Sequence, residues 1–326
     1  MIHHRGPSRR QALLGMGAAA LAPSTVSAQA YPSKQITFVV PFVAGSGTDT
    51  MARLVGERLS AIVGQPVIVD NKAGASGSIA ATTVARAQPD GHTLMFTTNT
   101  SHAANPSLLK TMAYDPVKDF EPVALLGLAP FVLVVKPDLP VKSFAELVAK
   151  AKAEPGKLSY GAGTSTSIVC GESMKRLAGI DILRVPYRSA PPALNDVMAG
   201  QIDMTFIDIG TGLPHIRAGK LRTLVATDAQ RSPHLPDVPT FRELGIEFDL
   251  VAWYAIYAPA KTPAEIVGKL NATANEIMAS ADMKQRMDQF SVIIRTGTPA
   301  HLGEWTKSEI DKWARLSKAA GIEPEG

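Results

Sequence analysis

Apolar runs of strand length alternate with amphipathic stretches in the first hundred residues of the chain. Residues 36–40 form a continuous β-branched and aromatic run, which predicts a buried strand. After a short loop, apolar residues recur at helical spacing between Leu54 and Val63 and predict an amphipathic helix. Two more strands are predicted at residues 67–70 and 93–98. This β-α-β-α-β series predicts an α/β fold with a parallel sheet.

The first strand leads into a loop of small residues, Ala44-Gly45-Ser46-Gly47-Thr48-Asp49, that precedes the helix. Such a loop exposes unpaired backbone N–H groups and the positive end of the helix dipole. Its natural guest is an anion, so we expect it to hold one end of a small carboxylate. Valine at Gly45 is expected to block that approach. Asp49 is interpreted as serving the helix start rather than as an acid or a base.

Two further stretches are expected beside this loop. Ligands of parallel sheets bind at the carboxyl ends of the strands, which is where residues 97–101 follow the third strand. In the second half of the chain, residues 157–160 predict a strand that leads into Gly161-Ala162-Gly163-Thr164-Ser165-Thr166-Ser167 and a helix. The alternative is an ordinary Ser/Thr helix cap, but the run of small and hydroxyl residues exceeds what capping needs. We therefore expect this second loop to oppose the first.

The remaining pattern predicts the other strands and helices. Residues 123–135 and 251–257 are apolar and are expected to cross between two lobes. A strand at residues 202–208 ends in Asp208, where cleft residues belong. Other strands are expected at residues 183–187 and 221–226, and helices at residues 143–153, 190–198, 214–218, 264–279 and 304–319.

The N-terminus has the pattern of an export signal. Arg5, Arg9 and Arg10 precede an apolar stretch at residues 12–21 that is too short to span a bilayer. Ala28-Gln29-Ala30 is a small-x-small site, so cleavage is expected after Ala30. We favour ordinary secretion, with the twin-arginine route as the alternative. The expected location is the periplasm.

Charge and chemistry argue against several classes of function. The whole chain has 33 basic and 29 acidic residues, but three of the arginines lie in the signal. Without the signal, 30 basic and 29 acidic residues remain, a net charge of +1. This balance gives no support for nucleic-acid binding. Cys170 is the single cysteine and is interpreted as a small buried apolar residue. No catalytic or metal-binding motif occurs, and among the scattered histidines only His102 is kept as a candidate ligand contact.

A set of ordered motifs carries a resemblance over essentially the whole mature chain. The motifs are Tyr31-Pro32, Val40-Pro41-Phe42-x-Ala44-Gly45, Thr48-Asp49, Gly64-Gln65-Pro66-Val67, Asn71-x-x-Gly74-Ala75, Pro89-Asp90-Gly91, Val185-Pro186-Tyr187, Ala218-Gly219-Lys220-Leu221-Arg222, Pro236-Asp237-Val238-Pro239-Thr240, and Trp253 followed by Ala258-Pro259-Ala260-x-Thr262-Pro263. Through them the chain resembles the Bug-type extracytoplasmic solute-binding receptors of tripartite tricarboxylate transporters.

The resemblance implies a type II periplasmic-binding-protein fold, with two α/β lobes and a ligand cleft between them. Lobe 1 is expected to comprise residues 31–130 and 254–326, and lobe 2 residues 131–253. The implied function is capture of a di- or tricarboxylate or an aromatic acid and its delivery to the membrane permease subunits of such a transporter. No enzyme activity, cofactor or metal is implied, and we expect a monomer. A ligand-sensing receptor for a signalling kinase and a periplasmic enzyme on the same fold stay open as alternatives.

The residues expected to contact ligand follow from the loops and strand ends. Arg188 is the nearest plausible cation, with a solvated surface charge as its alternative, and Asp208 alternatively organises loop N–H groups or water. The expected contacts are Phe42, Ala44, Gly45, Ser46, Thr48, Asp49, Thr98, Asn99, Gly163, Thr164, Ser165, Thr166, Ser167, Arg188 and Asp208.

Two positions depart from the family pattern. Ser189 stands where the family usually has glycine, and Val169-Cys170 stands where a histidine is usual. Both lie beside the expected cleft. A less polar wall there would suit an aromatic or a longer aliphatic acid.

Overall fold

The computed structural model describes residues 1–2 and 31–325 of the 326-residue chain. The export signal predicted at residues 1–30, with its cleavage after Ala30, therefore lies outside the described residues apart from Met1 and Ile2.

A ten-stranded mixed sheet runs through the described part of the chain, in the order β2-β1-β3-β9-β4-β7-β5-β6, with β8 and β10 also paired to β4. β1 pairs in parallel with both β2 and β3, so the parallel arrangement predicted for the first three strands is confirmed. The strands are β1 (Ile36–Val40), β2 (Val67–Asn71), β3 (Thr93–Thr98), β4 (Phe120–Val135), β5 (Ser159–Ala162), β6 (Leu183–Pro186), β7 (Met204–Asp208), β8 (Arg222–Ala226), β9 (Val251–Pro259) and β10 (Ile293–Ile294).

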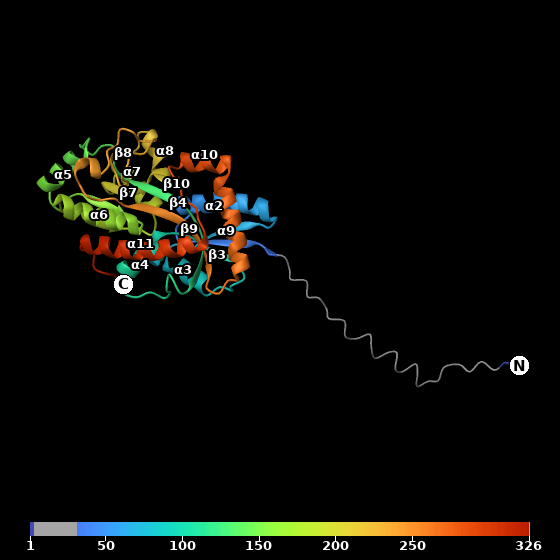
Figure 1. The fold of residues 1–326 in the computed structure, drawn as a ribbon. Coiled ribbons are helices and arrows are strands. Elements are labelled where there is room, and N and C mark those ends of the chain that lie inside the picture. The colour runs from blue at the N-terminus through green and yellow to red at the C-terminus, as the bar shows by residue number, and fades with distance from the viewer. Residues whose placement is uncertain (3–30, 326) are drawn as a thin grey trace.

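Two long strands connect the two ends of the sheet (Figure 1). β9 pairs antiparallel with residues 120–130 of β4, whereas β7 pairs with residues 131–135 of the same strand. The lobe boundary predicted at residues 130 and 131 thus falls where β4 changes partners, and the other predicted boundary falls inside β9. The division into lobes stays a prediction, and β4 and β9 are the segments that would join them.

Helices cover both faces of the sheet, and α11 passes below α6 and β9 in Figure 1. A single-turn π-helix at Thr100–Ala104 and 3₁₀ turns at Ala75–Gly77 and Arg242–Leu244 complete the helical structure of the described residues. The α-helices are α2 (Gly47–Val63), α3 (Ser78–Ala85), α4 (Asn105–Leu108), α5 (Phe144–Ala153), α6 (Ser165–Ala178), α7 (Ala190–Met198), α8 (Ile209–Arg217), α9 (Ala264–Ala279), α10 (Ala281–Gln289) and α11 (Pro299–Ala319).

Helix starts are where the sequence prediction was least accurate. The short helix predicted at residues 214–218 is α8, which begins directly after β7 because the Asp208 side chain accepts a hydrogen bond from Thr211 N and caps it. α11 begins five residues earlier than predicted, where Thr298 caps it ahead of Pro299. α10 was not predicted. It follows α9 at once through Ser280, which ends one helix and caps the next.

The core lies on both faces of the sheet because side chains alternate along β4. Phe131, Leu133 and Val135 join the main core cluster, which also contains β1, β3 and β9. Val132 and Val134 face the other way, into a smaller cluster with α7 and α8. A strand buried on both faces reads as a continuous apolar run, as β4 does.

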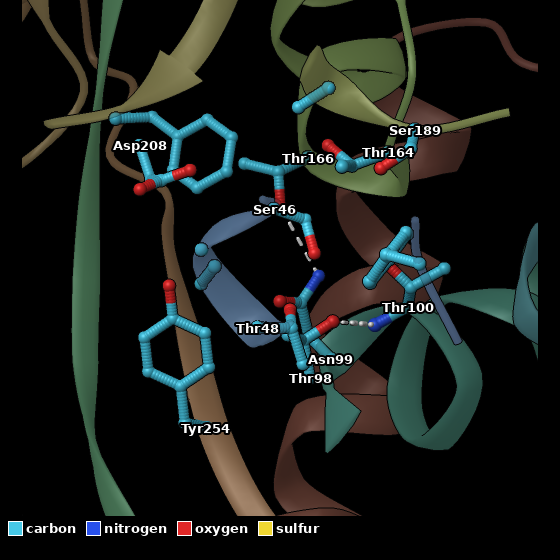
Figure 2. A pocket seen from close by; sticks show the side chains of 15 residues that line it. Ser46, Thr48, Thr98, Asn99, Thr100, Thr164, Thr166, Ser189, Asp208 and Tyr254 are labelled. Carbon is cyan, nitrogen blue, oxygen red and sulfur yellow. Dashed lines mark hydrogen bonds between the residues drawn. The ribbon is translucent and has the colours of Figure 1, made fainter. Parts of the chain in front are cut away.

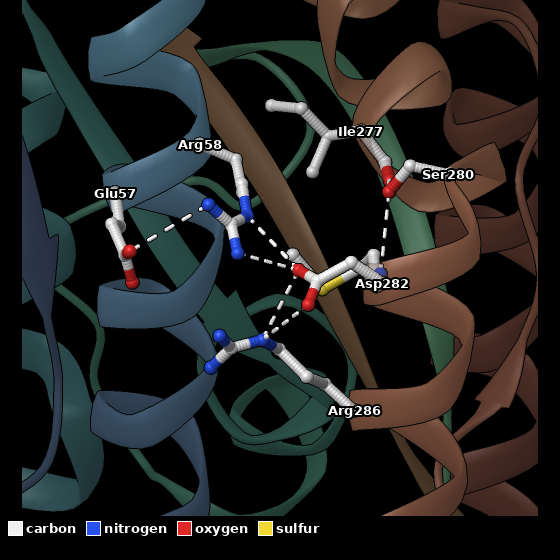
Figure 3. A network of polar contacts seen from close by, with 7 residues as sticks. Glu57, Arg58, Ile277, Ser280, Asp282 and Arg286 are labelled. Atoms are coloured by element: carbon white, nitrogen blue, oxygen red, sulfur yellow. Dashed lines mark hydrogen bonds and ion pairs between the residues drawn. The ribbon is translucent and has the colours of Figure 1, made fainter.

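An ion-pair network links the outer half of α2 to α10 (Figure 3). Arg58 Nη2 lies 2.6 Å from Asp282 Oδ2, and Arg286 Nε lies 3.2 Å from the same oxygen. These side chains are partly exposed, so the pairs contribute little stability. They link the outer half of α2 to the start of α10, whereas the first turn of α2 follows the β1–α2 loop.

Candidate functional site

A cavity lies where the ends of the strands meet the starts of several helices (Figure 2). Its walls come from segments far apart in the chain, including the β1–α2 loop, the end of β3, the start of α6 and the middle of β9. The lining residues are Phe42, Ser46, Gly47, Thr48, Thr98, Asn99, Thr100, Phe131, Thr164, Thr166, Ser189, Ala190, Asp208, Ala252 and Tyr254.

Four helices begin at this cavity, and their N-cap residues line it. Ser46 caps α2 by accepting from Asp49 N at 3.2 Å, and Thr164 caps α6 by accepting from Ser167 N at 3.1 Å. Asp208 caps α8, and Ser189 occupies the cap position of α7 without a side-chain cap bond. Each N-terminus carries about half a positive charge. Their convergence makes the cavity suited to an anion.

Hydrogen bonds between side chains close the cavity on one side. Asn99 Nδ2 donates to Ser165 Oγ at 3.0 Å and to Thr166 Oγ1 at 3.2 Å. The hydroxyls of Thr100 and Ser165 lie 2.9 Å apart. Asn99 and Thr100 follow β3, whereas Ser165 and Thr166 begin α6. These bonds therefore join two of the stretches that were expected to lie at the same site, the one after β3 and the one that begins α6.

Two buried polar atoms of the lining have no hydrogen-bond partner among the described residues. They are Asn99 Oδ1 and Ser189 Oγ, both on side chains that are completely buried. A buried polar group without a partner is costly, and native proteins rarely leave one so. The wall of the cavity thus contains one acceptor and one hydroxyl without a hydrogen-bond partner in the described part of the chain.

One end of the cavity is formed by Asp208, Tyr254 and Gly47. The Tyr254 hydroxyl points toward Asp208 in Figure 2. A Cβ atom built on Gly47 would lie 2.7 Å from that hydroxyl and 2.9 Å from Asp208 Oδ1. Burial raises the pKa of Asp208, although the hydrogen bond from Thr211 opposes the shift. Burial, and secondarily the Asp208 charge, raises the pKa of Tyr254, which keeps its phenol neutral.

The predicted ligand contacts fall into three groups. Eight line the cavity, and a second, neighbouring cavity is lined by Gly163, Ser165 and Arg188 together with Phe42 and Thr164. Ala44, Gly45, Asp49 and Ser167 line neither cavity, because they shape the loops from behind. Gly45 has open space around it, so the glycine that keeps room at the cavity is Gly47. The eight that line the first cavity are Phe42, Ser46, Thr48, Thr98, Asn99, Thr164, Thr166 and Asp208.

Asp49 holds the β1–α2 loop together, in agreement with its interpretation as a residue that serves the helix start. Its carboxylate accepts from Gly45 N and from Asn71 Nδ2, each at 2.9 Å, and Arg53 Nη2 lies 2.9 Å away. Burial alone would raise the pKa of Asp49, but the hydrogen bonds from Arg53, Gly45 N and Asn71 outweigh it and lower the pKa. The ionised carboxylate is therefore part of the loop structure.

This pKa shift predicts how the stability of the loop depends on pH. The pKa of Asp49 is lower in the folded protein than in the unfolded chain, where it is about 3.9. The stability that the ionised Asp49 carboxylate adds to the folded protein is therefore present above about pH 4. It is lost as the pH falls through the lower pKa of the folded state. Asp49→Asn should lower the free energy of unfolding at pH 7, with a smaller difference from wild type at pH 3. Urea unfolding of both proteins at the two pH values measures this, and an equal difference at both would contradict it.

Neither His102 nor Cys170 lines the cavity. His102 is completely buried, stacks on Tyr257 with ring centroids 3.9 Å apart, and touches Phe120 edge-on. Burial lowers its pKa to about 3, so the imidazole is neutral. The expectation that His102 follows the β3 loop was right, but the side chain turns into the core. Cys170 is fully buried in α6, and burial raises the pKa of its thiol.

Seven lining residues were not predicted. Ser189 was noted only as a departure from the family pattern, although its place before Ala190-Pro191 is a helix-cap signal. Phe131, Ala252 and Tyr254 belong to the long strands β4 and β9, which reach the cavity along their length rather than at a carboxyl end. The rule used for parallel strands therefore did not find them. The others are Gly47, Thr100 and Ala190.

Two further features concern the classes of function. Within residues 1–2 and 31–325, no group of three or more His, Cys, Asp or Glu side chains is placed to hold a metal ion. Among the same residues, no helix has both the length and the apolar character needed to cross a membrane.

Comparison with known proteins identifies what this chain is similar to. Residues 51–322 match the model of the tripartite tricarboxylate transporter family receptor. The chain is 34% identical over 300 residues to protein BugT of Bordetella pertussis, covering 91% of this chain and 92% of that one. The structure of Rpa4515 from R. palustris with adipate has a TM-score of 0.88 at 36% identity, covering 90% and 100% of the chains. The periplasmic binding protein BugD has a TM-score of 0.86 at 33% identity, covering 90% and 100%. These likenesses confirm the predicted periplasmic-binding-protein fold.

Proposed function

Because this chain belongs to the tripartite tricarboxylate transporter receptor family, we propose that it captures a small carboxylate in the cavity and delivers it to the membrane subunits of such a transporter. The family consists of solute-binding receptors rather than enzymes, and its structurally known members include periplasmic binding proteins. The cleaved export signal and the monomeric state predicted from the sequence are part of the proposal.

The convergence of four helix N-termini on one cavity is the observation that carries this proposal. No lysine, arginine or histidine is among the lining residues. An anion would therefore be held by backbone N–H groups and by hydroxyls such as that of Ser189. This is the usual chemistry of anion sites at helix starts. The relative Rpa4515 was solved with adipate, a dicarboxylate, which supports a carboxylate as the anion here.

The free energies of the available interactions are compatible with a micromolar dissociation constant. A micromolar dissociation constant corresponds to about 8 kcal/mol. A charge-assisted hydrogen bond contributes roughly 1.5–3 kcal/mol, and association costs at least about 4 kcal/mol. Two opposing loops with about three donors each reach that range. Phe42, Phe131 and Tyr254 add apolar wall for the carbon skeleton of the ligand.

A thermal-shift panel of carboxylates on the mature protein tests the proposal. At 100 times its dissociation constant, a ligand adds about 2.7 kcal/mol of stability. This should raise the melting temperature by roughly 5 °C for a chain of this size. Phosphate and sulfate serve as matched inorganic anions that fit a helix N-terminus but lack a carbon skeleton. If no mono-, di-, tri- or aromatic carboxylate shifts the melting temperature, the carboxylate function is wrong.

A further inference from the structure

Asp208 is an acid in a cavity that is otherwise built for an anion. It is the single carboxyl among the lining residues, and no basic side chain lines the cavity with it. Its Oδ1 accepts from Thr211 N at 2.9 Å, which caps α8. An ionised Asp208 and a ligand carboxylate in the same small space would repel each other. A hydrogen-bond donor is therefore needed between the two carboxylates or beside one of them.

The surroundings of Asp208 supply hydrogen bonds from Thr211 but no cation among the residues that line the cavity. The titratable group that faces it is Tyr254 on β9, and the lining residues of α2, α6 and α7 contribute Gly47, Thr48, Thr166 and Ala190, none of which titrates. Burial is the largest influence on the Asp208 carboxyl and raises its pKa. The protein therefore encloses this carboxyl without supplying a cation to balance it.

Gly47 keeps the space beside this carboxyl free of protein atoms. A Cβ there would come within 3 Å of both Asp208 Oδ1 and the Tyr254 hydroxyl. Asp208 can only accept hydrogen bonds when ionised, whereas the tyrosine hydroxyl can donate as well as accept. The two oxygens thus offer neighbouring places, one for a donor on the ligand and one for a ligand oxygen.

Building on the proposed carboxylate function, we propose that Asp208 determines specificity by accepting a hydrogen bond from a hydroxyl or ammonium group that the ligand carries close to its carboxylate. The preferred ligands are then hydroxy acids or amino acids rather than unsubstituted acids. The helix N-termini hold the carboxylate, and the donor of the ligand hydrogen-bonds the Asp208 carboxyl, which no cation in the lining balances. The source of the donor, hydroxyl or ammonium, is distinguished by the ligands of the test.

Two matched series of acids test this by titration calorimetry at pH 7.5. The first is propionate, lactate and alanine, and the second is succinate, malate and aspartate. Within each series the members differ at one carbon by hydrogen, hydroxyl or ammonium. At least one donor-bearing acid should bind about tenfold or more tightly than its unsubstituted partner, the size of one charge-assisted hydrogen bond. Asp208→Asn, which keeps an oxygen for Thr211 N but presents an amide N–H₂ group to the cavity, should reduce this preference to about threefold or less.

Asp115→Asn is the matched control. Asp115 likewise accepts from backbone N–H groups, those of Val117 and Lys118, but lies outside both cavities. It should leave the preference unchanged. Should Asp208→Asn fail to fold, Asp208→Ser replaces it in the same comparison, because a serine hydroxyl can still cap α8 by accepting from Thr211 N but carries no charge.

Three results would overturn the inference. One is equal binding of substituted and unsubstituted acids, and another is a preference that survives in folded Asp208→Asn. The third is that an unsubstituted acid binds best and that its binding takes up a proton from solution. Asp208 would then be protonated by solvent instead of accepting a hydrogen bond from the ligand. In each of these cases an acid still binds, so the carboxylate function stands. If no acid binds in either series or in the thermal-shift panel, the function itself fails.

Discussion

Gly163→Ala is expected to abolish ligand binding and to destabilise the protein. A Cβ on Gly163 would lie 2.3 Å from the carbonyl oxygen of Ser189 and 2.8 Å from Ala190 N. These are backbone atoms, so no side-chain rotation relieves the overlap. Gly163 precedes the cap of α6 and Ser189 is the cap of α7. The substitution therefore pushes apart two walls of the cavity.

Calorimetry and denaturant unfolding measure both effects. Overpacking of this kind costs about 1–3 kcal/mol of stability, and we expect affinity for the tightest carboxylate to fall at least about a hundredfold. Gly268→Ala is the control, because Gly268 lies inside α9 with no atom within 4 Å of its built Cβ. There the same substitution should stabilise the helix by up to about 1 kcal/mol. Wild-type affinity in Gly163→Ala would show that these two walls do not form the binding site.

Trp253→Ala should be the most destabilising single substitution in the strands that join the two ends of the sheet. Trp253 is completely buried in β9, and its Nε1 donates to Glu309 Oε2 at 3.0 Å. Removing a buried tryptophan costs about 3–5 kcal/mol. The buried Glu309 carboxylate would also lose one of its two indole hydrogen bonds, keeping that from Trp313 Nε1 and the ion pair with Lys312 at 3.9 Å. A fall in melting temperature on the order of 10 °C is expected.

Trp305→Ala provides the comparison for that measurement. Trp305 lies on α11, as do Glu309 and Trp313, but it is only partly buried. Its loss should cost about 1–2 kcal/mol, in proportion to the smaller apolar area that it buries. Equal destabilisation by the two substitutions would show that the buried contact between β9 and α11 contributes no more stability than a partly buried tryptophan does.

The strand-loop-helix units could be predicted because each carries its whole signal within about twenty residues. β1, its loop and α2 are one such unit, and the segment from β5 to α6 is another. The contacts between these units were only inferred from a general rule about strand ends. The hydrogen bonds from Asn99 to Ser165 and Thr166 join the second of these units to the stretch after β3, which was also expected at the site. They join residues more than sixty positions apart, a distance over which no local pattern extends.

The contribution of β4 and β9 to the cavity could not be predicted in this way. Both strands are buried on each face, so their sequences read as uniform apolar runs without a preferred side. Nothing in such a run indicates which residue, such as Phe131 or Tyr254, faces a cavity instead of the core. The choice between Gly45 and Gly47 was equally hidden. Both are glycines of one loop, and only the positions of Tyr254 and Asp208 show which of them needs to lack a side chain.

The four helix starts around the cavity also affect how such a receptor can diverge. A backbone N–H group is present whatever the side chain, proline excepted, so most point mutations leave these donors in place. Side chains such as Phe42, Ser189 and Asp208 can therefore change without removing the means of holding an anion. Among family members that share about a third of their residues, the backbone N–H groups that bind the anionic group would be inherited. The rest of the ligand could then differ from one member to the next.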